Sequence, residues 1–179
     1  MTATRRIDLK AVLERTLSRL SGDLVTRPTG KAVRSGVVEQ LADLDREAVV
    51  VIDFTTVRIL DISCADEIVG KLLIGHGTAR YFVLHGVSAA HCDSIEQVLE
   101  RHQLAVVART RDGRVQVLGP LAETARTAFR VIFDLGSTDR EQLASELSWP
   151  ADTAQRALDE LTSRRLVQMS ADRYVAVTV

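Results

Sequence analysis

The stretch that decides the fold is residues 49–68, which read VVVIDFTTVRILDISCADEI. It begins with a continuous β-branched run, Val49 to Ile52, of the kind found in strands that are covered on both faces. The run ends at Asp53, and a short loop leads to a helical pattern near Ala65. We therefore predict a buried strand at the centre of a sheet, followed by a strand-to-helix junction.

The helix after this junction is predicted from its apolar spacing. Five apolar residues fall at i, i+3, i+4, i+7 and i+8, which places them on one buried helical face. They are Ala65, Ile68, Val69, Leu72 and Leu73. Asp66, Glu67 and Lys71 fall between these positions and are expected to face solvent. Gly75 and Gly77 are expected to end the helix.

Strand and helix patterns alternate on either side of the deciding stretch. Upstream, a short strand over residues 24–26 precedes a helix through residues 33–41. Downstream, a covered strand over residues 81–84 leads to a helix through residues 95–99. The Asp112-Gly113 pair then favours a hairpin turn between two apolar runs. This order indicates a mixed α/β sheet over residues 23–119.

Residues 1–22 predict an amphipathic helix of about four turns that ends at Gly22. Its apolar positions are Leu9, Val12, Leu13, Leu17 and Leu20, and its basic residues are Arg5, Arg6, Lys10, Arg15 and Arg19. We expect this helix to cover an edge or a face of the sheet. Attachment to an anionic membrane surface and a dimer seam, as in a homodimer, are the alternatives.

Residues 120–179 have a different pattern, and Gly119-Pro120 is the expected boundary. One helix ends at Gly136, Ser137 or Thr138 is expected to cap a second, and Trp149-Pro150 makes the turn to a third. A short hairpin with its turn at Ala171-Asp172 follows. Three helices and a hairpin in about 60 residues match a small winged-helix domain, whose third helix is the candidate groove reader.

Composition excludes several classes of protein. The 179 residues are 46% hydrophobic with a net charge of −1, which predicts a packed core. The chain contains no apolar run near the roughly 20 residues that a transmembrane helix needs, so we expect no membrane insertion. The amino terminus does not read as a secretory signal, which favours a cytoplasmic location. We interpret Cys64 and Cys92 as free thiols in the core.

Residues 49–68 resemble the STAS superfamily, whose members include bacterial anti-anti-sigma factors, and are most similar to its STAS-like branch. The resemblance covers residues 24–118 and implies a surface that binds a protein partner, such as a kinase or a sigma-factor regulator. In anti-anti-sigma factors, a serine just after an aspartate is phosphorylated by the partner kinase. Asp61 occupies the aspartate position here, but Ile62 follows it, and Ser63 lies one residue further on.

The side chain of Ser63 could have either of two roles. As a phosphosite, it would place phosphate at a helix amino terminus, where exposed amides favour an anion. As an N-cap, its hydroxyl oxygen would accept an amide hydrogen bond, with Asp66 as an imperfect capping-box partner. Asp66 and Glu67 would also complement the helix dipole. In either case we expect Asp61 to Glu67 to lie on the surface and to form the partner-binding site.

Residues 121–179 resemble the winged helix-turn-helix domains of bacterial regulators, through residues 139–147, 153–161 and 166–167. The resemblance implies that Thr153, Gln155 and Arg156 would reach base edges and that Arg173 would contact phosphate. Residues 120–179, however, carry a net charge of −2, which opposes binding to DNA. Protein interaction or dimerisation is therefore an alternative role for this segment.

The sequence lacks the spacing of a metal or catalytic site. His85, His91, Cys64 and Cys92 include no Cys-x-x-Cys or His-x-x-x-His pair, and we expect His91 to be partly exposed. No phosphate-binding glycine loop or nucleophile elbow occurs. We therefore expect neither an enzyme nor a bound cofactor or metal.

These features together predict a non-enzymatic cytoplasmic regulator. Its STAS-like part would bind a protein partner, and its winged helix would bind DNA or mediate assembly. The alternative is a winged-helix transcriptional regulator whose α/β domain serves for dimerisation or ligand sensing.

Overall fold

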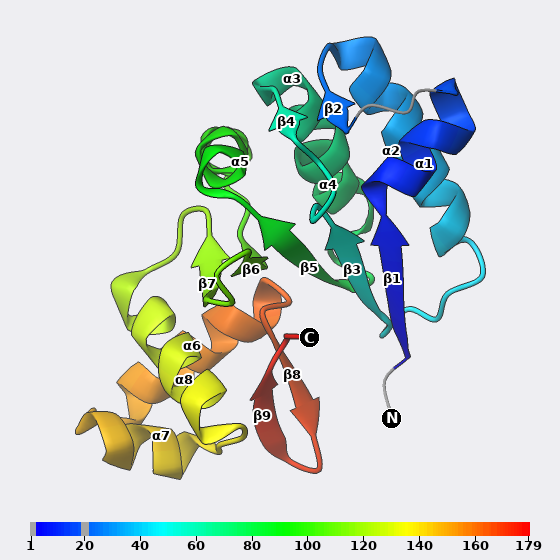
Figure 1. Cartoon of the computed structure of the whole chain (residues 1–179). Coiled ribbons are helices and arrows are strands. Elements are labelled where there is room, and N and C mark those ends of the chain that lie inside the picture. Colours follow the sequence, from blue (N-terminus) through cyan, green and yellow to red (C-terminus); the bar gives the residue numbers. More distant parts are fainter. Residues whose placement is uncertain (1–2, 19–21) are drawn as a thin grey trace.

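The computed structural model describes residues 3–18 and 22–179, and a five-stranded sheet runs through it (Figure 1). The order is β1 (Thr4–Asp8), β3 (Val49–Asp53), β5 (Tyr81–Val87), β6 (Val106–Thr110) and β7 (Val115–Leu118). The first four strands are parallel, and β7 is antiparallel to β6. Two small sheets pair β2 (Asp23–Leu24) with β4 (Ile59–Leu60) and β8 (Val167–Ser170) with β9 (Arg173–Ala176). The predicted α/β class is confirmed.

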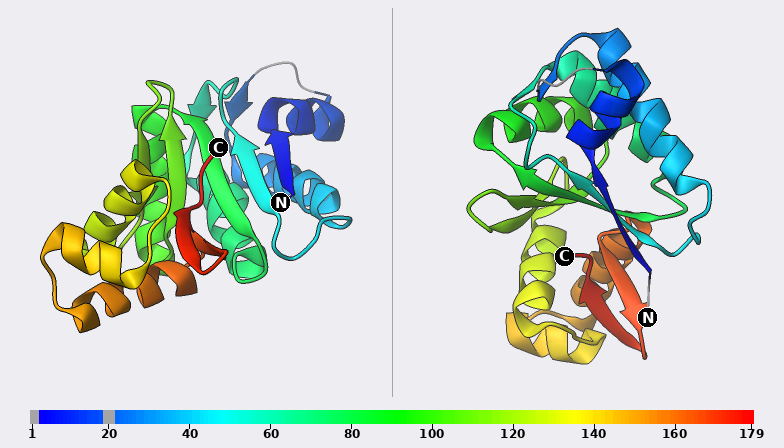
Figure 2. Two further views of the ribbon diagram at one scale, coloured as in Figure 1. Left: turned by 90° about the horizontal axis from the view of Figure 1, so that it is seen from below. Right: turned by 45° about the vertical axis from the view of Figure 1, so that its right-hand side comes forward.

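One face of the sheet is covered by the helices that connect its parallel strands (Figure 2). They are α1 (Leu9–Leu17), α2 (Arg27–Leu41), α3 (Ile62–Ala65), the π-helix η1 (Asp66–Lys71), α4 (Leu72–His76) and α5 (Ala89–His102). Val50 and Ile52 of β3 and Leu84 of β5 point into this layer and pack with the buried faces of the helices. The residues predicted from Ala65 to Leu73 are all buried here, as expected.

The opposite face of the sheet is covered by the carboxyl-terminal segment, which contains α6 (Glu123–Leu135), α7 (Arg140–Leu147), α8 (Ala151–Ser163) and the β8–β9 hairpin. Successive side chains of a strand point to opposite faces. Val49 and Val51 therefore face this segment and share a core with Phe129 of α6 and Leu158 of α8. Burial on both faces explains the continuous β-branched run of β3.

The chain passes from the sheet to α6 through a turn that requires glycine. Gly119 has φ +92°, and a Cβ atom there would lie 2.1 Å from the carbonyl oxygen of Leu104. Arg126 of α6 fixes the turn, because its guanidinium donates to the carbonyls of Val117 at 2.6 Å and Gly119 at 2.9 Å. The predicted boundary at Gly119-Pro120 thus lies between two parts that share one core.

Residues 4–8 form a strand, so the prediction of one helix over residues 1–22 was wrong for this part. Residues 4–8 pair with β3, although only Ile7 among them is buried. The helix begins at Leu9, where the Asp8 carboxylate accepts from the amides of Lys10 and Ala11, and it ends at Leu17. Backbone pairing with a buried strand outweighs the weak apolar pattern of β1. The predicted positions Arg19 and Leu20 lie outside the described residues.

Two smaller predictions also need correction. The central strand is β5 rather than β3, because β1 adds to the outer edge of β3. Helix α7 is capped by Asp139, whose carboxylate accepts from the amide of Gln142 at 2.8 Å, and not by Ser137 or Thr138.

The hairpin at Asp112-Gly113 is present as predicted. Among the described residues, no helix has both the length and the apolarity needed to cross a bilayer.

Candidate partner-binding surface

Asp61 organises the junction between β4 and α3. Its Oδ1 accepts from the amide of Cys64 at 2.7 Å, which makes Asp61 the N-cap of α3. Its Oδ2 accepts from the amide of Thr26 at 2.8 Å, immediately before α2. Burial raises the pKa of Asp61, but these amide hydrogen bonds outweigh that effect and hold the pKa below its usual value. Asp61 thus joins the beginnings of two helices as a carboxylate.

The predicted N-cap role of Ser63 was wrong, because Asp61 takes the cap. The Ser63 hydroxyl instead donates to Asp61 Oδ1 at 2.8 Å. Ser63 is the second residue of α3 and is partly exposed. A phosphate on Ser63 would therefore lie at a helix amino terminus and also directly beside the Asp61 carboxylate.

The backbone at Thr26 is strained. Its φ of +73° and ψ of 141° lie in a region that β-branched residues rarely adopt. Two contacts hold it there: its amide donates to Asp61, and its carbonyl accepts from Cys64 Sγ at 3.0 Å. Helix α2 also crosses α3 closely, because a Cβ atom at Gly30 would lie 2.9 Å from the Cα of Cys64.

Cys64 takes part in this junction as a neutral thiol. Burial, with the nearby Asp61 carboxylate, raises its pKa to about 12. The side chain is fully buried, as predicted, and Cys92 is partly buried. Both cysteines are free thiols.

Asp66 and Glu67 are buried, which corrects the expectation that they face solvent. Their exposed fractions are 6% and 1%. Both belong to the π-helix η1, which the regular helical spacing did not predict. Helix α5 packs closely against η1, because a Cβ atom at Gly70 would lie 2.7 Å from Val98 Cγ1. Such π-helical turns are frequent at functional sites.

The two buried carboxylates contact basic side chains from three helices, and we call these six residues the Asp66–Glu67 cluster. They are Asp66, Glu67 and Lys71 of η1, Arg27 and Arg34 of α2, and His102 of α5. Arg27 Nη1 lies 2.7 Å from Asp66 Oδ2 and 2.8 Å from Glu67 Oε1. His102 Nε2 lies 2.8 Å from Asp66 Oδ1.

Glu67 has two further cationic partners. Lys71 Nζ donates to Glu67 Oε1, and Arg34 Nη2 lies 3.2 Å from Glu67 Oε2 as an ion pair without hydrogen-bond geometry. Burial raises the pKa of Glu67, but the hydrogen bonds from Lys71 and Arg27 outweigh it and lower the pKa. Burial also raises the pKa of Asp66, but the hydrogen bonds from His102 and Arg27 outweigh it, so this pKa is lowered as well. Both groups are charged at neutral pH.

The exposed part of this region combines apolar and basic side chains. Ile59 of β4 and Ile62 of α3, on either side of Asp61 in the chain, are 48% and 39% exposed. The Arg27 side chain is 48% exposed while it contacts both buried acids. We call Ile59, Ile62, Ser63 and Arg27 the junction surface. Asp66 and Glu67, predicted as contact residues, are buried beneath Arg27, whereas Ile59, Ile62 and Arg27 are exposed and Ser63 is partly exposed.

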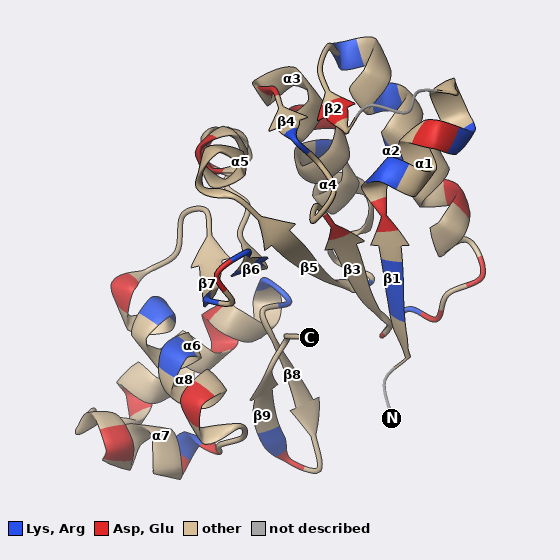
Figure 3. Ribbon diagram, viewed as in Figure 1, with Lys and Arg blue, Asp and Glu red and all other residues tan. Residues whose placement is uncertain are grey.

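Three of the residues predicted to read DNA lie on α8 and one lies on β9, and Gln155, Arg156 and Arg173 hydrogen-bond to other residues of this segment. Gln155 donates to Asp159 at 2.8 Å, and Arg156 Nε donates to the carbonyl of Asp152 at 3.3 Å. Thr153 is partly exposed. Arg173 in β9 donates to Ser137, Asp139 and Gln142, so its guanidinium joins the hairpin to α7. Figure 3 shows acidic and basic residues interspersed over α6, α7 and α8.

The histidines and cysteines do not form a metal centre in the described part of the chain, where no group of three or more potential ligands comes together. His91 is buried, contrary to the expectation of partial exposure. Its Nδ1 accepts from the amide of Ser88 at 3.2 Å, as part of the capping box of α5. Burial lowers the pKa of His91 and keeps its ring neutral.

Comparison of the sequence with protein-family models and with curated proteins gave no match. The class that the structure defines is therefore a mixed α/β fold with helices on both faces of its sheet.

Proposed function

We propose that this chain is a non-enzymatic cytoplasmic regulator that binds a protein partner through the junction surface. The observation that carries the proposal is the exposure of Ile59 and Ile62, which flank Asp61 in the chain, together with the half-exposed side chain of Arg27 at the start of α2. Arginine is enriched at protein interfaces, and the buried centre of an interface is more apolar than the rest of the surface. The resemblance of residues 49–68 to the STAS superfamily supports a partner such as a kinase or a sigma-factor regulator.

The rigidity of the supporting layer favours the same proposal. Asp61 joins α2 to α3, and the Asp66–Glu67 cluster joins α2, η1 and α5 directly beneath the surface. A surface held in one conformation loses little conformational entropy when a partner binds. The charged groups of the cluster face Arg27, so an acidic group of the partner would have to compete with Asp66 and Glu67 for it. We therefore infer that Ile62 contributes most of the binding energy.

We further propose that the carboxyl-terminal segment contributes to assembly rather than to DNA binding. It covers one face of the sheet through a shared core. Phosphate contacts by Lys and Arg supply much of the affinity of DNA-binding domains. On the exposed face of α8, Arg156 stands between Asp152 and Asp159, which would repel phosphate.

Co-purification with matched variants tests the proposal. A tagged chain is expressed in its host as the wild type, as Ile62→Glu and as Ile74→Glu. Ile74 is 56% exposed on α4, at the other end of the same helical stretch, and serves as the control. We expect a stoichiometric partner with the wild type and Ile74→Glu and its loss with Ile62→Glu. Equal recovery with both variants, or no partner with the wild type, would contradict the proposal.

A further inference from the structure

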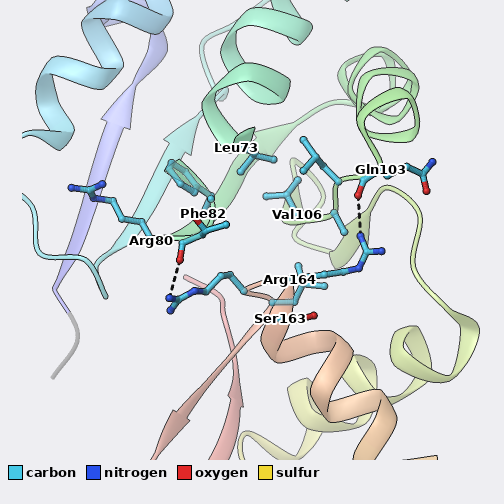
Figure 4. Close-up of a pocket in the computed structure, with 13 residues that line it drawn as sticks. Leu73, Arg80, Phe82, Gln103, Val106, Ser163 and Arg164 are labelled. Carbon is cyan, nitrogen blue, oxygen red and sulfur yellow. Dashed lines mark hydrogen bonds between the residues drawn. The ribbon is translucent and has the colours of Figure 1, made fainter. Parts of the chain in front are cut away.

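A cavity of about 360 Å³ lies at the amino ends of β5 and β6, where the sheet meets the end of α8 (Figure 4). Its walls come from α4 and its connection to β5, from the first residues of β5 and β6 with the loop before β6, and from the end of α8 with its connection to β8. Strand β5 begins at Tyr81 and the junction surface lies beyond the opposite ends of the strands, so the cavity is a separate site (Figure 1).

The inner wall of the cavity is apolar. Leu73, Phe82, Val106 and Leu166 line it, and each is at most 8% exposed. Binding sites for small molecules have such a lining, with a few polar groups that fix the orientation of the ligand, and volumes of roughly 300 to 1,000 Å³. The cavity therefore suits a small molecule with an apolar body.

The rim of the cavity is cationic. Arg165 lies at one part of it, where its guanidinium contacts Glu47 at 2.9 Å, the carbonyl of Thr78 at 2.9 Å and the ring of Tyr81 at 4.9 Å. These three contacts hold Arg165 in place. Arg80 also lines the cavity, but its guanidinium extends away from it and donates to carbonyls of residues 41 and 44 (Figure 4). The group available to a ligand is therefore a third arginine, Arg164.

The guanidinium of Arg164 is held by two partners, but not all of its N–H groups are hydrogen-bonded. Its Nη1 donates to the carbonyl of Gln103 at 3.2 Å (Figure 4). Its Nε lies 3.5 Å from Glu160 Oε1. Within the described part of the chain, no acceptor is bonded to its Nη2. A guanidinium has five N–H donors, and paired N–H groups match the two oxygens of a carboxylate. With Ser163 beside it at the cavity mouth, Arg164 provides a place for an anionic head group.

We propose that this cavity binds a small carboxylic acid with an apolar body, whose carboxylate contacts Arg164 and whose body packs on Phe82 and Val106. Such a ligand would contact both the sheet and the end of α8, so its binding would couple the two layers of the fold. This inference is independent of the proposed protein-binding function.

Calorimetric titration of the full chain with octanoate and with its neutral analogue, octanamide, tests this site. We expect saturable binding of octanoate at least tenfold tighter than that of octanamide. Arg164→Gln should remove this preference, and Arg156→Gln, on the exposed face of α8, should leave it unchanged. Ser163→Trp, which fills the exposed mouth, should abolish binding of both probes and keeps the test decisive should Arg164→Gln not fold.

Three results would overturn the inference: no saturable binding by the wild type, equal affinities for the two probes, or equal effects of Arg164→Gln and Arg156→Gln. Retention of octanoate binding by folded Ser163→Trp would place the ligand elsewhere and would also overturn it. Loss of partner binding in Ile62→Glu has no bearing on these outcomes.

Discussion

The amide of Thr26 donates to the carboxylate of Asp61 at 2.8 Å, across 35 positions of sequence. This contact fixes the start of α2 against the start of α3, and it holds Thr26 in a strained backbone conformation. The junction surface is built around it, since Ile62 and Arg27 are the residues that directly follow the two bonded residues in the chain. The stability and the shape of this surface should therefore depend on Asp61.

Replacement of Asp61 tests this dependence. Asp61→Ala removes an N-cap, which costs about 1 kcal/mol, and leaves the amide of Thr26 without its acceptor, which costs about 1–2 kcal/mol more. We expect the free energy of unfolding in urea to fall by about 2–3 kcal/mol. Asp43→Ala, at an exposed position after α2, is the control and should change it by less than about 0.5 kcal/mol. Similar losses in both variants would argue against a special role for Asp61.

Glu67 should contribute more than exposed acids do. Glu67→Gln leaves Lys71, Arg27 and Arg34 facing a neutral amide. Removal of one partner of a fully buried ion pair costs about 3–5 kcal/mol. Because the cations here are partly exposed, we expect a loss of about 2 kcal/mol in urea unfolding. Glu47→Gln removes the exposed partner of Arg165 and should cost at most about 1 kcal/mol. A loss for Glu67→Gln no larger than that of the control would contradict this role.

Acid should destabilise the fold through the Asp61 cap and the Asp66–Glu67 cluster. The pKa values of Asp61, Asp66 and Glu67 are lowered in the folded protein, so folding is favoured by their charged forms. This stabilisation is complete above their unfolded pKa values near 4 and is lost as the pH falls through the lower folded values. Urea unfolding between about pH 6 and pH 3 should show falling stability, with a shallower slope in Glu67→Gln. Equal slopes would show that Glu67 does not carry this dependence.

A negative charge on Ser63 should disturb the junction. Ser63→Asp, as a mimic of phosphorylation, places a second carboxylate beside Asp61 and should lower the free energy of unfolding by about 1–2 kcal/mol. Ser63→Ala removes one hydrogen bond and should cost about 0.5–1 kcal/mol. Ser35→Asp, on the exposed side of α2, controls for charge alone. Stability of Ser63→Asp equal to that of Ser63→Ala would exclude repulsion from Asp61.

DNA should not bind to α8 with appreciable affinity. Because Asp152 and Asp159 accompany Arg156, titration with a labelled duplex of about 30 base pairs at low salt should give no binding that depends on Arg156. Arg140→Ala, on α7, is the matched control. Binding that weakens steeply with salt and is lost in Arg156→Ala, but not in Arg140→Ala, would restore the DNA-binding hypothesis.

The elements predicted correctly have local signals. The β-branched run of β3, the apolar face from Ala65 to Leu73 and the Asp112-Gly113 turn all depend on residues within a short window, and the structure contains each of them. The carboxyl-terminal helices and hairpin were also predictable, because their apolar spacing and turn residues are regular.

The elements that were missed depend on contacts between distant residues. Strand β1 has one buried side chain, and only the neighbouring β3 makes it a strand. Asp66 and Glu67 look like solvent-facing residues because their partners Arg27, Arg34 and His102 lie more than 30 positions away. The one local hint was their place in a helix followed closely by Lys71. A sequence pattern cannot show which cations a fold brings to a buried acid.

Photo-crosslinking at Ile62 in host cells tests the central claim most directly. A photoreactive phenylalanine analogue replaces Ile62 in one strain and Ile74 in another, so that both ends of the same helical stretch are sampled in the folded chain. We predict one discrete crosslinked protein from position 62 and its absence from position 74. The same crosslink from both positions, or none from position 62 in a chain that folds normally, would contradict the claim that the junction surface binds a protein partner.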